Sequence, residues 1–252
     1  MKEKNMHRVL IPIDSQNAES WSYALAYAEK MIEPRQNSAN VVLLVHTKNQ
    51  IRSTGLSSHI GSPQVKILNS GKPLTLPSGA QLQLKTLKTL GYTLRDTIVI
   101  AFYADDKLLQ VVDDHKELAG VIAIPDLPGD ADLWVARWAP IVHGQVTKPA
   151  TKLISDPVVE NALLAITKMV NLSTGIGHPR DKEYANENLR ILKTKGHSLD
   201  PDVLRSWAIQ NGWRSSDAND LAILAKKIWG LKNNPSLSKI YNWRERYVSW
   251  SG

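Results

Sequence analysis

The chain has 252 residues, a net charge of +7 and no cysteine. The lack of cysteine excludes a disulfide framework, a thiolate zinc site and a cysteine nucleophile. Its longest apolar runs, such as Val41 to Val45 and Ile98 to Phe102, are too short to cross a membrane, and the first seven residues are too polar for a secretory signal. We therefore predict a cytoplasmic protein with no membrane association.

The first 45 residues predict a strand, a helix and a second strand. Val9 to Ile13 and Val41 to Val45 are short apolar runs of the kind that form strands buried on both faces. Between them, apolar residues recur at three- and four-residue spacing from Ala18 to Ile32, and Pro34 ends that helix. A strand, helix and strand in this order predict a parallel pair with a right-handed crossover.

Residues 48–93 are punctuated by glycine and proline. We expect short strands around Val65 to Leu68 and Leu74 to Leu76 in this stretch. Gln81 to Leu90 follows as a predicted helix, because Leu84, Leu87 and Leu90 fall on one side and Gly91 can end it.

Regular alternation resumes after residue 96. The pattern predicts strands at Thr97 to Tyr103 and Val121 to Ile124, and helices at Asp105 to His115 and Asp130 to Trp138. Strands that alternate with helices predict an α/β fold with a doubly wound, mostly parallel sheet. We assign this domain to residues 1–147 and a smaller all-helical domain to residues 148–252.

The opening of the chain is similar to a known family. Val9 to Ser15, the alanine-rich helix Tyr23 to Ala28 and the strand Val42 to His46 resemble the first elements of universal stress proteins, in which a strand ends in a Pro-x-Asp turn. The resemblance implies an adenine-nucleotide pocket at the carboxyl ends of the strands, with Asp14 at its edge.

The chain departs from that family where phosphates would bind. Members that bind ATP carry a glycine-rich stretch whose backbone N–H groups hold the phosphates. Here the strand that ends at Tyr103 is followed by Ala104-Asp105-Asp106-Lys107, and the next glycine is Gly120. Because an acidic loop repels phosphate, this departure argues against ATP binding and hydrolysis of the family type. The resemblance still implies an adenine nucleotide as cofactor, although this chain lacks the phosphate-binding loop of the family.

Four carboxylates, Asp14, Asp105, Asp106 and Asp126, each follow a predicted strand end, where open sheets place ligands. They could hold a divalent cation or a ribose hydroxyl, or they could cap the helices that follow. Histidines with the spacing of metal ligands do not occur, and we predict no metal site. The predicted ligand-binding residues are Asp14, Ser15, His46, Tyr103, Asp105 and Asp126.

Helix start and stop signals are frequent in the second half. Asp156-Pro157 and Asp200-Pro201 combine a capping residue with a first-turn proline, Asp181 opens a helix between them, and Ser215 or Ser216 caps a later one that Gly230 closes. These signals predict an all-helical domain.

The last two of these helices have the spacing of a helix-turn-helix unit. Ala208 allows close approach, and Gly212 can take the positive φ of the turn. Trp213, Ala218 and Leu221 fall where such units bury apolar side chains. We expect nucleic-acid contacts from polar and basic residues at or near the second helix, although Asp217 and Asp220 in its first turn oppose phosphate. These residues are Arg214, Ser215, Ser216, Asn219, Lys226, Lys227 and Lys232.

Charge and tryptophan point to partners of the second half. Residues 151–252 carry 15 Lys and Arg against 10 Asp and Glu, whereas residues 1–150 carry 16 against 14. A basic excess favours an anionic partner. Trp243, Tyr247 and Trp250 in the C-terminal tail are candidates for docking onto a protein partner or onto the first domain.

Three functions fit these observations. The first is a non-catalytic regulatory or adaptor protein, in which a stress-protein-like domain is coupled to a basic helical module that binds nucleic acid or protein. The second is a scaffold subunit of a larger assembly. The third is a metal-dependent nuclease or nucleotide hydrolase that uses the strand-end carboxylates, which would have to converge on a metal.

Overall fold

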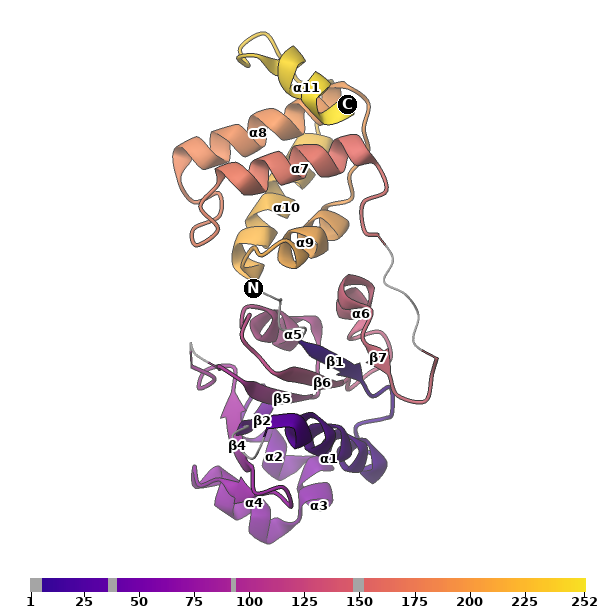
Figure 1. The fold of residues 1–252 in the computed structure, drawn as a ribbon, viewed down its shortest axis with the longest axis vertical. Coiled ribbons are helices and arrows are strands. Elements are labelled where there is room, and N and C mark those ends of the chain that lie inside the picture. Colours follow the sequence, from indigo (N-terminus) through magenta and orange to yellow (C-terminus); the bar gives the residue numbers. More distant parts are fainter. Residues whose placement is uncertain (1–5, 36–39, 92–93, 147–151) are drawn as a thin grey trace. The chain divides into compact units, whose positions relative to one another are not determined.

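The computed structural model describes residues 6–35, 40–91, 94–146 and 152–252, and the chain divides into two compact units, residues 1–150 and 151–252. The first unit contains a sheet with helices, and the second contains helices (Figure 1). The domain boundary that the sequence predicts, between residues 147 and 148, lies outside the described residues.

A seven-stranded sheet forms the first unit, in the order β3-β4-β2-β5-β6-β1-β7. All neighbouring strands are parallel except β3 and β4, which are antiparallel. The α/β fold with a mostly parallel sheet is thus confirmed. The strands are β1 (His7–Leu10), β2 (Asn40–Val45), β3 (Leu74–Thr75), β4 (Gln81–Thr86), β5 (Thr97–Phe102), β6 (Gly120–Ile124) and β7 (Ile141–Val142).

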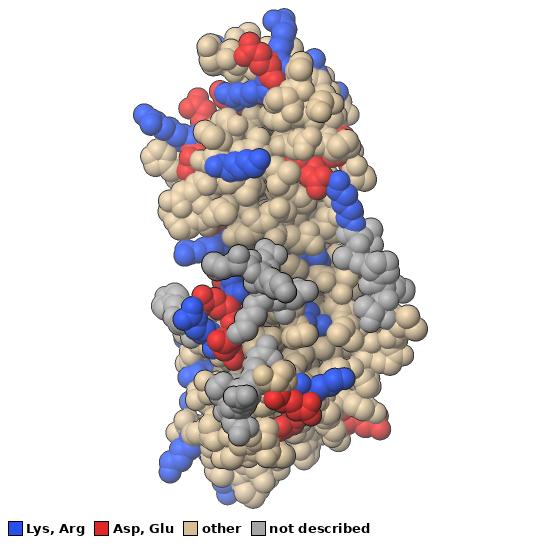
Figure 2. All heavy atoms as spheres, in the orientation of Figure 1, with Lys and Arg blue, Asp and Glu red and all other residues tan. Residues whose placement is uncertain are grey.

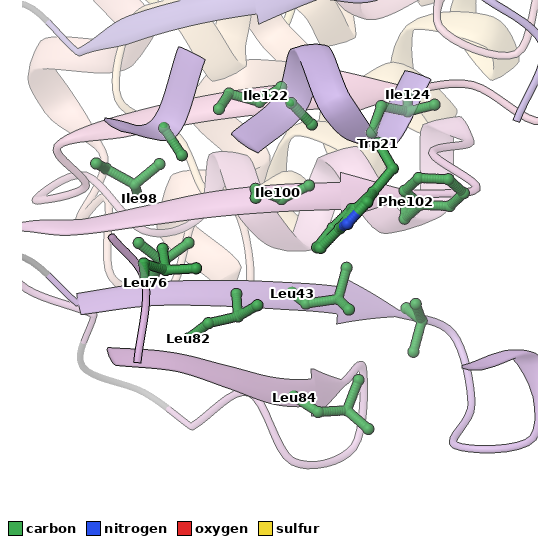
Figure 3. Close-up of a cluster of buried hydrophobic side chains, with 14 of the residues drawn as sticks. Trp21, Leu43, Leu76, Leu82, Leu84, Ile98, Ile100, Phe102, Ile122 and Ile124 are labelled. Carbon is green, nitrogen blue, oxygen red and sulfur yellow. The ribbon is translucent and has the colours of Figure 1, made fainter. Parts of the chain in front are cut away.

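Helices cover both faces of this sheet because its central strands are apolar on both faces. Side chains of one face form a core with α1, and those of the other pack against α5 and α6. Trp21 of α1 meets Phe102 of β5 edge-on, with 6.3 Å between the ring centroids (Figure 3). The helical segments of this unit are α1 (Ala18–Ile32), the 3₁₀ segment Glu33–Arg35, α2 (Gln50–Ser53), α3 (Leu56–Ile60), α4 (Ser62–Asn69), α5 (Asp106–Asp113) and α6 (Asp132–Trp138).

Two expected elements of residues 48–93 are wrong. Gln81 to Leu90 is not a helix: residues 81–86 form the strand β4, in which buried and half-buried side chains alternate with the period of two that a strand requires. Val65 to Leu68 is not a strand but part of α4, which has Pro63 in its first turn. Val65 and Leu68, three residues apart, are the buried side chains of this helix. The short strand expected around Leu74 is present as β3.

The first two strands run in the same direction but are not neighbours. β5 and β6 lie between β1 and β2 in the sheet, so the chain passes over two strand positions in this crossover. The prediction that these two strands pair directly with each other is therefore wrong. Local sequence sets the strands and the helix between them, whereas strand order depends on contacts with strands that come later in the chain.

The described residues of the second unit, 152–252, form five helices. Three of them begin at a side chain that accepts hydrogen bonds from the first-turn N–H groups: Asp156 at α7, His178 at α8 and Asp200 at α9. The helix expected to open at Asp181 thus begins two residues earlier, at Pro179. The helices are α7 (Pro157–Met169), α8 (Pro179–Thr194), α9 (Pro201–Gln210), α10 (Ser215–Trp229) and α11 (Trp243–Ser251).

Candidate functional site

Polar residues at the carboxyl ends of the parallel strands form two groups. At the ends of β1 and β6, the buried Ser15 hydroxyl donates a 2.8 Å hydrogen bond to Asp126, and the Ser15 carbonyl lies 3.2 Å from His59 Nε2. Asp14, also at the end of β1, accepts a 2.8 Å hydrogen bond from the backbone N–H of Gln16. The structure thus brings Ser15 and Asp126 together, as bonded partners within the fold.

The second group lies at the ends of β2 and β5. His46 Nε2 is 3.2 Å from Asp105 Oδ1. The same Asp105 oxygen accepts a 2.8 Å hydrogen bond from the Leu108 N–H and so caps α5, as the capping interpretation predicts. Tyr103 has a positive φ of 60°, and its buried hydroxyl donates to Thr54. Each of these three side chains therefore has a partner inside the first unit.

A pocket of about 410 Å³ opens beside Asp14. Its walls come from the segments that follow β1 and β6, with apolar residues such as Leu10, Ile13 and Leu127, and the carboxylates Asp14, Asp126 and Asp132. None of the described residues that line it is Lys or Arg. The three carboxylates make the pocket acidic, which disfavours a phosphate and agrees with the missing glycine-rich loop.

Among the described residues, no group of three or more His, Asp and Glu side chains is arranged to hold a metal ion. The metal-dependent alternative is therefore supported only by the positions of the strand-end carboxylates in the sequence. In the same described part of the chain, the helices are all too short or too polar to span a bilayer.

In the second unit, α9 and α10 pack on each other through the residues expected of a helix-turn-helix unit. Ala208, Trp213, Ala218 and Leu221 are all buried, and Gly212 has a φ of +91° in the turn. These burial and turn predictions are confirmed. Since many helical hairpins share them, they do not by themselves identify a DNA-binding unit.

The first turn of α10 differs from expectation. Ser215 is buried as the first residue of the helix, so its side chain cannot contact nucleic acid, and the cap position belongs to Arg214, which makes no side-chain capping bond. Asp217 packs so closely on the loop before α8 that a Cβ added to Gly175 would lie 2.4 Å from the Cβ of Asp217. Part of the turn that would read bases is therefore covered. The other predicted nucleic-acid contacts are exposed: Arg214, Ser216, Asn219, Lys226, Lys227 and Lys232.

A groove of about 690 Å³ runs between α8 and α10. Apolar side chains from α10 and the segment after it form its floor, whereas its rim is polar and mostly basic. The end of α10 is fixed to α8 by Lys193, whose ammonium group donates to the carbonyls of Ile228, Trp229 and Leu231. We use the name α8–α10 groove for the surface formed by Lys182, Glu183, Asn186, Arg190, Leu224, Lys227, Ile228, Leu231 and their neighbours Gly177, Pro179 and Pro235.

The comparisons with known proteins concern this second unit. Residues 155–251 match the family model of a domain of unknown function, DUF1889. The match extends from just before α7 to the last residue of α11 and so includes the whole α8–α10 groove. No curated protein and no solved structure matches the chain.

Of the basic residues that line the groove, the sequence analysis names Lys227 as a nucleic-acid contact but does not name Lys182 or Arg190. Lys182, Asn186 and Arg190 recur every four residues on α8, so their shared face could have been read from the spacing. The spacing of residues on one helix does not show whether its polar face lies beside an apolar face of another helix. That information comes only from the packing of α8 on α10.

The tryptophan-bearing tail also differs from the expected docking segment. Residues 243–251 form α11, which packs on α7, and Asn161 donates a 2.9 Å hydrogen bond to the Trp250 carbonyl. Trp250 is buried within the second unit and is not available to a partner. Trp243 and Tyr247 are half-buried, and both rings are within about 5 Å of the Lys195 ammonium group.

Proposed function

We propose that the chain is a non-catalytic regulatory or adaptor protein of the cytoplasm, in which the helical unit is the binding module for an anionic macromolecule. In this proposal the α/β unit is a stress-protein-like domain coupled to that module. The observation that carries the proposal is the α8–α10 groove, where Lys182, Arg190 and Lys227 surround an apolar floor.

The charges of the helical unit support an anionic partner. Lys182 and Lys227 are exposed, and Lys226 and Lys232, which are close to Lys227 in the sequence, are also exposed. Glu183 is the single acidic residue among the described residues that line the groove. A site with this balance attracts anions and speeds their association at low salt.

The strand-end residues are not required for this activity. Ser15, Tyr103 and Asp105 have bonding partners within the α/β unit, and Asp14 lies at a pocket with an acidic lining. We therefore expect the binding of an anionic partner to survive the Asp14→Ala substitution.

The test measures binding of two labelled polyanions, polyglutamate and a DNA duplex, to the full chain across a salt titration. The Lys182→Glu/Lys227→Glu variant should bind at least about tenfold more weakly at low salt, because it reverses two charges on the groove rim. The matched control, Lys168→Glu/Lys239→Glu, changes the net charge equally at exposed positions outside the groove.

The control variant and Asp14→Ala should both bind as the unaltered chain does. If neither polyanion binds at low ionic strength, or if the two double variants lose affinity equally, the proposal is wrong.

A further inference from the structure

The floor of the α8–α10 groove contains more apolar surface than an anion alone needs. All three of its leucine and isoleucine residues line the groove: Leu224 and Ile228 are 9% and 3% exposed, whereas Leu231 is 45% exposed. An exposed leucine beside two buried ones offers a partner an apolar contact that phosphate or carboxylate groups cannot use.

The length and depth of the groove suit a helix. Pro179 and Arg190 both line it and lie eleven residues apart on α8, which corresponds to about 16 Å, or three helical turns. A volume of about 690 Å³ accommodates several large side chains. An amphipathic helix presents such side chains at i, i+3 or i+4, and i+7 along one face.

The rim determines the charge of that helix. Lys182 and Arg190 on α8 and Lys227 on α10 are positioned to meet acidic residues that flank the apolar face of a partner. Arg190 donates one hydrogen bond, of 2.8 Å, to the Ser236 carbonyl, which leaves further guanidinium donors for a carboxylate.

The distribution of charge favours a protein over a nucleic acid. A nucleic-acid surface follows the phosphate backbone with a continuous basic stripe. The face drawn in Figure 2 shows Lys and Arg interspersed with Asp and Glu, and the lining of the groove includes Glu183 beside its basic residues. Asp217 is half-buried in the first turn of α10, where base contacts would be made, and Asp220 is exposed in the next turn.

We infer that the α8–α10 groove binds an acidic amphipathic helix of a partner protein, with the apolar face of that helix on Leu224, Ile228 and Leu231 and its carboxylates at Lys182, Arg190 and Lys227. This inference rests on the proposed function and adds the class of partner. A second copy of the chain is a poor occupant, since the helical unit is itself basic, with 15 Lys and Arg against 10 Asp and Glu.

The experiment uses fluorescence anisotropy with the full chain at about 150 mM salt, where weak surface attraction is screened. The probe is a synthetic helical peptide of about 14 residues, with leucine at i, i+3 or i+4, and i+7 and glutamate beside them. A peptide of the same composition in scrambled order and a DNA duplex serve as competitors. The ordered peptide should bind at least about tenfold more tightly than the scrambled one.

Two single substitutions compare an apolar residue that lines the groove with one that does not. Leu231→Ala should weaken binding of the ordered peptide at least about fivefold, because it removes the exposed apolar contact. Ile223→Ala is the matched control: Ile223 is 58% exposed on α10 but does not line the groove. Ile223→Ala should leave the affinity for the ordered peptide unchanged, and circular dichroism melting of both variants checks that they fold.

Several outcomes overturn the inference. Equal binding of the ordered and scrambled peptides, or tighter binding of the duplex, would show a general polyanion surface and leave the proposed function standing. A dimer in light scattering that is lost on Leu231→Ala would assign the groove to a second copy. If no probe binds even at low salt, both the inference and the proposed function fail.

Discussion

Asp113 is a carboxylate that is only 3% exposed in the core between the sheet, α5 and α6. Arg137, 1% exposed, donates to it, and so do the indole N–H groups of Trp134 and Trp138 at 3.3 and 3.0 Å. The Arg8 guanidinium lies 3.7 Å from the centre of a Trp138 ring. Burial raises the pKa of Asp113, and the charge of Arg137 and the Trp138 hydrogen bond oppose that rise. These neighbours offset only part of the effect of burial, and the pKa of Asp113 stays above its ordinary value.

The first prediction concerns Arg137→Met, which leaves Asp113 buried without its closest positive charge. The free energy of unfolding should fall by about 3–5 kcal/mol, the usual loss when one partner of a buried ion pair is removed. Urea denaturation measures the loss, and hydrogen exchange of the β5 and β6 amides assigns it to the first unit.

The matched double variant tests the cause of that loss. Asp113→Asn/Arg137→Met removes both charges but keeps an amide oxygen for the two indoles, so it should recover part of the stability lost by Arg137→Met alone. A double variant at least as unstable as the single one would mean that Arg137 acts through packing and not through its charge.

At the scale of elements, local pattern decides what can be predicted. The strands β2, β5 and β6 are apolar on both faces and short, and α1 lies between Asn17, whose side chain caps it, and Pro34. These signals are local, so the sequence is sufficient to predict the elements. Leu84, Leu87 and Leu90 have helical spacing, but residues 81–86 also alternate, and the pairing of β4 with β2 favours the strand.

The start of α7 joins three segments of the helical unit through one carboxylate. Asp156 accepts hydrogen bonds from the N–H groups of Val158 and Val159, and its second oxygen lies 2.6 Å from His197 Nδ1. His197 Nε2 is in turn 3.1 Å from the hydroxyl of Tyr247 in α11. Although burial raises the pKa of Asp156, the hydrogen bonds from His197, Val159 and Val158 outweigh it and hold the pKa below its usual value.

The second prediction follows from this lowered pKa. Because the unfolded chain binds a proton at Asp156 more readily than the folded one, the stabilisation is present above the ordinary pKa of about 4 and is lost as pH falls below it. Asp156→Asn keeps an oxygen for capping but does not titrate, so its stability should be lower at neutral pH and should change less between about pH 5 and pH 3. Urea denaturation of both chains at each pH measures the difference. Parallel pH profiles would contradict the prediction.

For the whole molecule, the candidate site was harder to predict than the fold. The excess of Lys and Arg in residues 151–252 is visible in the sequence, and the groove with a mostly basic rim lies in the same half of the chain. The groove itself needs α8 and α10 side by side, with Lys193 fixing the end of α10 to α8. Contacts between helices that are distant in sequence create this surface, so no single segment contains its pattern.

The third prediction is that residues 152–252 fold without the first unit. The fragment contains all of α7 to α11, and its buried residues include Leu163, Leu189, Trp213 and Ile228 from four segments of the unit. The DUF1889 match over residues 155–251 falls within the same limits. With its own apolar core, a unit of this size is expected to unfold cooperatively. Circular dichroism of the fragment should show a helical spectrum and a single sigmoidal urea transition. In the full chain, the urea midpoint of the helical unit should be the same with and without Arg137→Met. A fragment that is unfolded, or that melts without a cooperative transition, would mean that the helical unit depends on residues 1–150 for its stability.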